Sequence, residues 1–175
     1  MNRGVAACAS ASPECETIAV GVGALAVVDD PDAVLVTHAL GSCVAVCIWD
    51  PEVRVAGLLH FLLPGSLGDS HRARVQPEAF ANSGIPLLFK TAYRHGLQKS
   101  RAVVYLVGGA EIAQVNMASS RIGRRNVIAA RRILWENGVL IEREETGGAA
   151  PRSVYLSAET GRLRIRAGNE HVVIE

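Results

Sequence analysis

Two strand-like apolar runs on either side of a turn constrain the fold of this chain more than any other feature of its sequence. The first run covers residues 43–49 and the second covers residues 54–61. Between them, Asp50-Pro51-Glu52-Val53 has the composition of a type I turn, with aspartate first and proline second. The sequence therefore predicts an antiparallel hairpin over this stretch.

Counting outward from the predicted turn determines which side chains of the hairpin lie opposite one another. A turn closed at these four residues pairs Trp49 with Arg54, and stepping back along both strands brings Cys43 opposite His60. Side chains directly opposed in an antiparallel ladder share one face, with Cβ atoms about 4.5–5.5 Å apart. The register therefore predicts a thiol and an imidazole within reach of proton transfer, unless a bulge shifts it.

A cysteine beside a histidine is the smallest set of side chains that can form a thiolate nucleophile. Proton transfer between them gives an ion pair that favours the thiolate. The preceding Leu40-Gly41-Ser42 is a small, flexible approach that leaves the thiol accessible and presents backbone N–H groups to an oxyanion. Each residue also has an ordinary structural explanation. Free cysteines usually pack as small hydrophobes, as we expect for Cys47, and a histidine in an apolar strand is most often a hydrogen-bonded core residue. The pattern alone leaves both interpretations open.

Length and charge limit the classes of protein to which the chain can belong. Its 175 residues suit one domain with a substantial core. A formal net charge of +1 gives no overall electrostatic reason to bind nucleic acid or an anionic membrane. We interpret the one local basic cluster as a solvated face, because no aromatic residue interleaves with its arginines. The cluster consists of Arg121, Arg124, Arg125, Arg131 and Arg132.

Cysteine usage and hydropathy indicate where the chain functions. All four cysteines, Cys8, Cys15, Cys43 and Cys47, lie in the first third of the chain, so they cannot form a disulfide framework for the rest. This distribution is typical of a reducing compartment. Residues 1–16 lack the apolar run of a signal peptide, and no segment reaches the roughly 18 apolar residues of a membrane span. We expect a cytoplasmic protein without membrane insertion, with a flexible tail over residues 1–16 and one domain over residues 17–175.

Hydrophobic periodicity and turn residues predict a strand-rich, mixed α/β domain. The expected helices cover residues 85–97 and 126–137, the second with Asn126 as its N-cap and Asn137-Gly138 as its stop. A long polar loop beginning at Pro64 is expected to form a mobile rim. Gly108-Gly109 is interpreted as a tight turn, because no Gly-Lys-Ser/Thr follows it. Strand-like patterns outside the hairpin cover residues 17–28, 33–37, 101–107, 139–143, 153–156 and 163–166.

Several segments of the sequence resemble the chemoreceptor glutamine deamidases of the CheD family. The most specific is Thr37-His38-Ala39-Leu40-Gly41-Ser42-Cys43, followed by His60 in His60-Phe61-Leu62-Leu63-Pro64. The resemblance extends in consistent order over roughly residues 20–166, which is not expected by chance. Its further segments are Gly108-Gly109-Ala110, Ile122-Gly123-Arg124-Arg125-Asn126, Glu145-Thr146-Gly147-Gly148 and the stretch from Val154 to Gly161.

The resemblance implies a fold, a reaction and partners. The implied fold is α/β (α+β-like), a single domain of mixed and antiparallel β-sheets with flanking helices, similar to the catalytic domain of the glutamine-deamidating cytotoxic necrotizing toxins. The implied reaction hydrolyses glutamine side chains of methyl-accepting chemotaxis receptors to glutamate and ammonia, and glutamyl methyl esters are a further substrate. A CheC-type phosphatase is the implied partner, and neither a cofactor nor a metal is implied.

The same resemblance assigns roles to individual residues. Cys43 matches the nucleophile, His60 the base, and Thr37 the group that orients the histidine. The backbone near Gly41 and Ser42 is the best source of N–H donors for the oxyanion.

The chain also departs from the family pattern at two points. Arg124-Arg125 stands where the family often has an acidic or polar residue beside the arginine, and Leu59 replaces a polar residue before the histidine. These departures concern the partner surface and the choice of substrate more than the reaction.

Three other functions are compatible with parts of the sequence. A zinc site has suitable residue types in His38, Cys43, Cys47 and His60. However, Cys43 and Cys47 would lie about 13 Å apart along a strand that rises about 3.3 Å per residue. A non-catalytic adaptor that binds receptors or a phosphatase would retain the same residues, and a cysteine peptidase would use the same pair to cleave the backbone. Analysis of the products distinguishes these functions.

Overall fold

The strands of the computed structural model form two five-stranded sheets, and the structure describes residues 16–66, 70–111, 121–168 and 170–174. One sheet has the order β1-β3-β8-β9-β10 and the other the order β2-β5-β4-β6-β7. The strands are β1 (Glu16–Ala19), β2 (Ala24–Val28), β3 (Ala33–Leu40), β4 (Val44–Asp50), β5 (Val55–Phe61), β6 (Val103–Gly108), β7 (Arg143–Thr146), β8 (Arg152–Ser157), β9 (Leu163–Ala167) and β10 (Glu170–Ile174). The helices are α1 (Ser70–Val75), the 3₁₀ turn η1 (Pro77–Ala79), α2 (Ala81–Arg94) and α3 (Ile122–Glu136).

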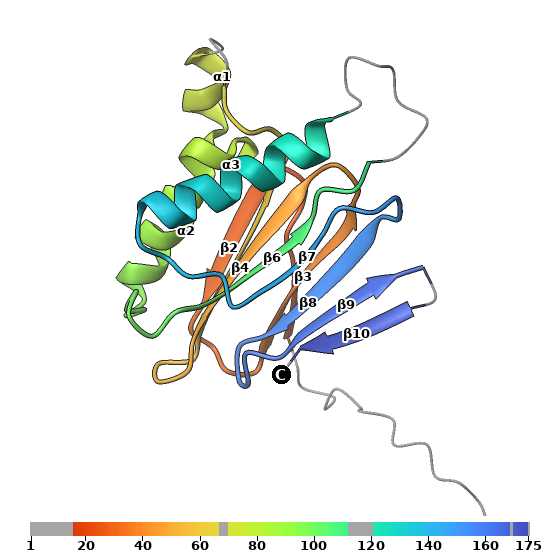
Figure 1. Ribbon diagram of the computed structural model, residues 1–175. Coiled ribbons are helices and arrows are strands. Elements are labelled where there is room, and N and C mark those ends of the chain that lie inside the picture. Colours follow the sequence, from red (N-terminus) through yellow and green to blue (C-terminus); the bar gives the residue numbers. More distant parts are fainter. Residues whose placement is uncertain (1–15, 67–69, 112–120, 169, 175) are drawn as a thin grey trace, which may run out of the picture.

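The two sheets and the helices stack in three layers, with α2 and α3 across the outer face of the sheet that contains β4 (Figure 1). Alternate residues of a strand point to opposite faces. Along β4, Val44, Val46 and Ile48 therefore pack under the helices, while Ala45 and Cys47 pack against the other sheet. Because both faces of this sheet are covered, β4 and β5 are apolar along almost their whole length. The mixed α/β class and the single domain with flanking helices expected from the sequence are confirmed.

The predicted hairpin is present as β4 and β5, but its register differs from the prediction by two residues. Ala45 lies opposite His60, and Cys43 lies just before the first residue of β4. Because side chains alternate with a period of two, a shift of two residues leaves every side chain on its predicted face.

The hairpin loop accounts for this difference. Asp50 stays in the ladder opposite Val55, so the four loop residues are 51–54 rather than the predicted residues 50–53. The Asp50 carboxylate accepts the N–H of Glu52 at 3.0 Å and the guanidinium of Arg101 at 2.8 Å, and Arg54 takes a positive φ of 53°. Burial alone would raise the pKa of Asp50, but the hydrogen bonds from Arg101 and the backbone hold it below its usual value. A buried, paired aspartate thus ends the strand, and the sequence pattern did not reveal that it is paired.

Both predicted helices are present, and both begin earlier than expected. Helix α2 begins at Ala81, so Pro86 lies in its second turn, and α3 begins at Ile122. Asn126 is therefore a buried residue inside α3 and not its N-cap, which corrects the prediction. The predicted stop is correct, because Gly138 takes the left-handed φ of 64° that ends a helix in this way.

The remaining elements agree in part with the sequence analysis. The closing hairpin is confirmed as β8 and β9, whereas β10 was not predicted. The strand expected over residues 139–143 begins only at Arg143, because the N–H of Val139 is bonded to the Leu134 carbonyl at the end of α3. The polar loop after Pro64 contains α1 and η1, which the prediction missed. Of the predicted tail, only Glu16 lies among the described residues, where it begins β1.

None of the helices in the described part of the chain combines the length and the apolar character needed to cross a bilayer.

Candidate active site

The fold brings Cys43 and His60 to the same face of one sheet, between the two sheets. His60 lies on β5 directly opposite Ala45, and Ala45 belongs to the apolar cluster between the sheets. Cys43 is half-buried and packs against that same cluster. Cys47, further along the same face, is fully buried, and burial raises the pKa of its thiol to about 12. As expected, Cys47 is a packing residue.

An irregularity in β3 shapes the approach to Cys43. The pairing of β3 with β8 shifts between Thr37 and Leu40, and Ala39 takes a positive φ of 57°. A non-glycine residue in this conformation costs roughly 1–3 kcal/mol, and bulges of this kind redirect side chains beside active sites. Here Thr37 is buried while the next residue, His38, is exposed.

Thr37 determines which nitrogen of His60 carries the proton. The Thr37 hydroxyl oxygen lies 2.7 Å from the Val20 carbonyl oxygen and 2.8 Å from Nδ1 of His60. A carbonyl only accepts, so the single hydroxyl hydrogen goes to Val20 and the hydroxyl oxygen accepts the Nδ1–H. The lone pair is therefore on Nε2, which is buried and has no hydrogen-bond partner among the described residues.

Burial determines the protonation of both groups. His60 is fully buried, which lowers the pKa of its imidazole to about 4. Burial raises the pKa of the Cys43 thiol, and its own backbone N–H opposes this only in part. Both shifts favour a neutral thiol and a neutral imidazole near pH 7, in place of the ion pair expected from the sequence.

The loop before β4 leaves two backbone donors available. The N–H of Gly41 is bonded to the Ala39 carbonyl at 2.8 Å, and the Cys43 carbonyl accepts the N–H of Gly109 at 2.7 Å. The N–H of Ser42 donates to no acceptor in the described part of the chain, and the N–H of Cys43 donates only to its own thiol. Of the predicted oxyanion donors, Gly41 is thus occupied within the loop, and Ser42 is free.

Buried Asn126 connects the loop of residues 41–43 to the residue that follows β5, the strand of His60. Its amide nitrogen donates to the Ser42 carbonyl at 2.9 Å and to the Leu62 carbonyl at 2.7 Å. Its Oδ1 is buried without a partner among the described residues, at a cost of roughly 1–3 kcal/mol. The sequence analysis missed this role. The available signal was a polar residue on the helix face that also carries Val127 and Leu134.

Glycines allow α3 to approach the site closely. A Cβ on Gly108, whose φ is 114°, would lie 2.4 Å from the Cys43 carbonyl oxygen, and a Cβ on Gly123 would lie 2.6 Å from the Gly109 carbonyl oxygen. The predicted tight turn at Gly108-Gly109 therefore lies between the loop of residues 41–43 and the start of α3.

Replacing Asn126 with aspartate is expected to remove both donated hydrogen bonds while keeping the side-chain volume. A carboxylate would then face two carbonyl oxygens, so we expect the free energy of unfolding to fall by roughly 2–4 kcal/mol. Guanidinium unfolding measures the loss. Asn137→Asp is the matched control, because the exposed Asn137 amide donates only to the Ile133 carbonyl at the end of the same helix, and its replacement is expected to cost about 1 kcal/mol or less. Equal stability of the two variants would contradict the role of the buried amide.

The low pKa of His60 predicts a pH dependence of stability. The unfolded imidazole binds a proton near pH 6.5, whereas the folded one does so only near pH 4, so unfolding takes up a proton between these values. The stabilisation is complete above pH 6.5 and is lost as the pH falls to about 4, by up to about 3 kcal/mol. Guanidinium unfolding of the wild type and His60→Gln at several pH values separates this contribution from that of the carboxylates. Identical pH dependence in the two proteins would contradict it.

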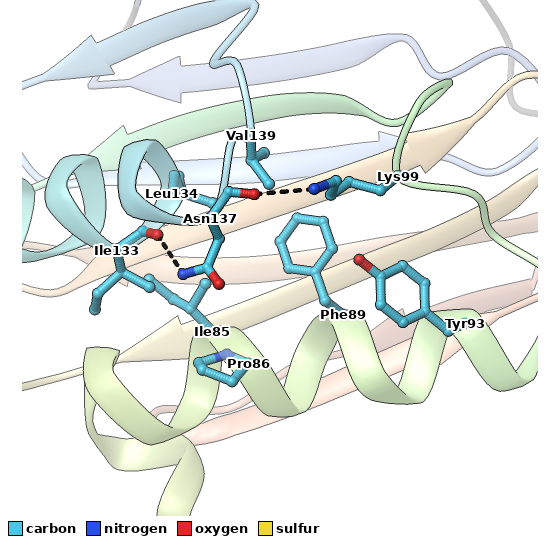
Figure 2. Close-up of a pocket in the computed structure, with 9 residues that line it drawn as sticks. All are labelled: Ile85, Pro86, Phe89, Tyr93, Lys99, Ile133, Leu134, Asn137 and Val139. Atoms are coloured by element: carbon cyan, nitrogen blue, oxygen red, sulfur yellow. Dashed lines mark hydrogen bonds between the residues drawn. The ribbon is translucent and has the colours of Figure 1, made fainter.

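An apolar cavity of about 240 Å³ between α2 and α3 lies in a different layer from Cys43 and His60. Figure 2 shows Phe89 and Tyr93 projecting into it from α2, with Lys99 donating to the Asn137 carbonyl at its rim. Its lining carries no cysteine, histidine or carboxylate. It therefore plays no part in the chemistry of the Cys43 site.

Comparison with known proteins supports the resemblance seen in the sequence. A family model described as CheD chemotactic sensory transduction matches residues 62–167. A probable chemoreceptor glutamine deamidase CheD 1 from Syntrophus aciditrophicus is 46% identical over 134 residues, which cover 77% of this chain and 83% of that protein. A probable chemoreceptor glutamine deamidase CheD 2 from Anaeromyxobacter dehalogenans is 44% identical over 153 residues, covering 87% of this chain and 96% of that protein.

A further relative is less similar, and the two longer alignments span the positions of the candidate site. A probable chemoreceptor glutamine deamidase CheD from Pyrococcus horikoshii is 36% identical over 159 residues, covering 90% of this chain and 96% of that protein. The family-model match begins just after His60. By contrast, the alignments with the Anaeromyxobacter and Pyrococcus proteins are too long to miss positions 43 to 60, wherever they begin.

Proposed function

The chain belongs to the CheD family, and we propose that it hydrolyses the side-chain amide of selected glutamines on methyl-accepting chemotaxis receptors, with Cys43 as nucleophile and His60 as base. The products are glutamate and ammonia. Relatives that carry the name chemoreceptor glutamine deamidase place the chain among the protein-glutamine glutaminases.

One observation carries the proposal, namely the hydrogen-bond chain from Val20 through Thr37 to His60. It assigns the lone pair to Nε2, on the sheet face shared with the Cys43 thiol. A core histidine with only a structural role would be expected to use both ring nitrogens when buried. Here the basic nitrogen is left without a partner among the described residues, as a general base requires.

In the first half of the reaction, the Cys43 thiol attacks the carboxamide carbon of the glutamine. Nε2 of His60 takes the thiol proton as the S–C bond forms, because the raised thiol pKa leaves little free thiolate beforehand. The negative charge moves to the amide oxygen, where the N–H groups of Ser42 and Cys43 stabilise it. His60 then returns its proton to the departing nitrogen, and the C–N bond breaks to release ammonia. The product is a thioester.

In the second half, a water molecule loses a proton to Nε2 of His60 and attacks the thioester carbon. The C–S bond breaks, the sulfur regains the proton from His60, and glutamate leaves. Thr37 keeps Nδ1 protonated in both halves, so Nε2 alone exchanges protons with the substrate. No group other than water is consumed.

Further proposals follow from the family resemblance. A glutamyl methyl ester presents the same carbonyl carbon, with methanol as leaving group, so the same residues would also hydrolyse it. A CheC-type phosphatase is the proposed regulatory partner, the toxin-like catalytic fold is the proposed distant relative, and the cytoplasm is the proposed location. The proposed deamidase domain covers residues 17–175, together with Glu16 at the start of β1.

Co-expression with a chemoreceptor fragment tests the proposed function. Deamidation adds about 1 Da to a glutamine and releases one ammonia. Mass spectrometry of the receptor and an ammonia assay with purified proteins are expected to detect both changes in equal amounts. Receptor binding without either product would favour the non-catalytic adaptor, and cleaved backbone fragments would favour a peptidase.

A further inference from the structure

Three arginines at the beginning of α3 are exposed and have no ion-pair partner among the described residues. They are Arg121, Arg124 and Arg125. The arginines further along the helix differ, since Arg131 is paired with Glu144 and Arg132 with Glu136. The arginine cluster seen in the sequence thus divides into a paired half, with an ordinary structural role, and an unpaired half.

The three unpaired arginines lie at a helix end where positive charge is unfavourable. The N-terminus of a helix carries a partial positive charge, so each cation in the first turn costs roughly 0.3–1 kcal/mol. The first turn of α3 has no acidic residue to offset this charge. Arg121 and Arg125 are also four residues apart, and like charges at this spacing repel each other on a helix. Helix stability therefore does not explain the three arginines.

The beginning of α3, which carries these arginines, lies beside the loop of residues 41–43. The residue that follows Arg125 is Asn126, whose side chain is bonded to the Ser42 carbonyl. Arg124 lines an open depression of about 500 Å³ together with Gly109, whose N–H is bonded to the Cys43 carbonyl. The same depression contains Arg131, which Glu144 neutralises, and the carboxylate of Glu111.

We propose that Arg121, Arg124 and Arg125 bind acidic side chains that flank the target glutamine on the substrate receptor. This inference rests on the proposed deamidase function. Guanidinium groups match carboxylates in charge and in geometry. A protein surface is favoured over nucleic acid, because the chain has a net charge of only +1 and no aromatic side chain stands between these arginines. The three side chains then select glutamines in an acidic setting, which gives a charge-based rule for substrate choice.

The experiment compares two peptides and three proteins. The peptides carry one glutamine flanked either by glutamates or by alanines. The proteins are the wild type, the double variant Arg124→Gln/Arg125→Gln, and Arg132→Gln, which removes one exposed charge further along the same helix. Ammonia release gives kcat and KM for each pair at low and high salt. Iodoacetamide labelling of Cys43 and thermal unfolding serve as readouts that do not depend on the substrate.

The wild type is expected to prefer the acidic peptide by roughly tenfold in kcat/KM at low salt, and to lose most of this preference at high salt. In the double variant we expect KM for the acidic peptide to rise by roughly tenfold with kcat unchanged, while Arg132→Gln retains the preference. Labelling of Cys43 is expected to be unchanged. Unfolding temperature is expected to be unchanged or higher, since the helix loses unfavourable charges.

Two results would overturn the inference without affecting the proposed function. One is equal kcat/KM for both peptides in the wild type, and the other is an unchanged KM in the double variant. Binding of duplex DNA by the wild type, lost in the double variant, would assign the arginines to nucleic acid and would also overturn it. By contrast, if no peptide or receptor fragment releases ammonia with the wild type, the proposed function itself is wrong.

Discussion

Replacing Cys43 with alanine is expected to abolish ammonia release from receptor glutamines, with a fall in kcat of about 10⁴-fold or more. The other described cysteine cannot replace Cys43, since Cys47 is fully buried and its thiol has a pKa of about 12. The fold is expected to persist, because Cys43 is only half-buried and a smaller side chain there leaves at most a small cavity. Circular dichroism and an ammonia assay on the same preparations measure both effects.

Cys47→Ala is the matched control for this prediction. It removes a thiol from the same strand face, so it is expected to cost roughly 1 kcal/mol of stability through lost packing while keeping most of the activity. Iodoacetamide is expected to inactivate the wild type by labelling Cys43. Activity in Cys43→Ala equal to that of the wild type would exclude the covalent mechanism. If iodoacetamide inactivated the protein while labelling only Cys8 or Cys15, the assignment of Cys43 as the nucleophile would be wrong.

The sequence was sufficient to place the thiol and the imidazole on one face of one sheet. Two apolar runs around an aspartate-proline turn predicted the hairpin. The predicted register was wrong by two residues, but side chains alternate between the two faces of a strand, so Cys43 and His60 were still placed correctly on the same face. That error came from Asp50. Its carboxylate is held by Arg101, which is distant in sequence, so turn composition alone did not show that Asp50 stays within the ladder.

The sequence pattern could not predict contacts between segments that are far apart in the chain. Asn126 reads as a helix cap when only its neighbours are considered, because asparagine favours that position. In the folded chain it lies one turn inside α3 and is bonded to carbonyls at positions 42 and 62. The bond from Thr37 to Val20 is similar, since it joins β3 to the loop after β1. The family resemblance named Thr37 as the group that orients His60 by accepting a ring N–H, but only the tertiary structure shows that this nitrogen is Nδ1 and that Val20 takes the hydroxyl hydrogen.

These contacts also explain how an uncharged residue can orient the base. A carboxylate beside His60 would raise the imidazole pKa and hold a proton on the ring. Thr37 instead accepts the Nδ1–H without adding charge, and burial keeps the imidazole neutral at pH values well below 6.5. As the proposed base, His60 is therefore able to accept the thiol proton over a wide range of pH.

Replacing His60 with glutamine is expected to lower kcat by roughly 10²–10⁴-fold, the usual contribution of a general base. Glutamine fills a similar volume and its amide N–H can still donate to Thr37, so the buried hydrogen bond is retained while the basic nitrogen is lost. The wild type is expected to lose kcat/KM only as the pH falls toward about 4, where the imidazole takes up its proton, rather than near 6.5. Stopped assays of ammonia release between pH 4 and pH 8 measure both proteins.

The variants Thr37→Val and Thr37→Ser test whether activity depends on the hydrogen bond from the Nδ1–H of His60 to the Thr37 hydroxyl. Valine removes the acceptor for Nδ1–H, so the ring is free to place its proton on Nε2, and we expect kcat to fall by roughly tenfold or more. Serine keeps the hydroxyl and is expected to retain most of the activity. The assignment of His60 would be wrong if His60→Gln kept the wild-type rate. A wild-type acid limb centred near pH 6.5 would instead show that the imidazole is solvated during catalysis, contrary to its burial in the structure.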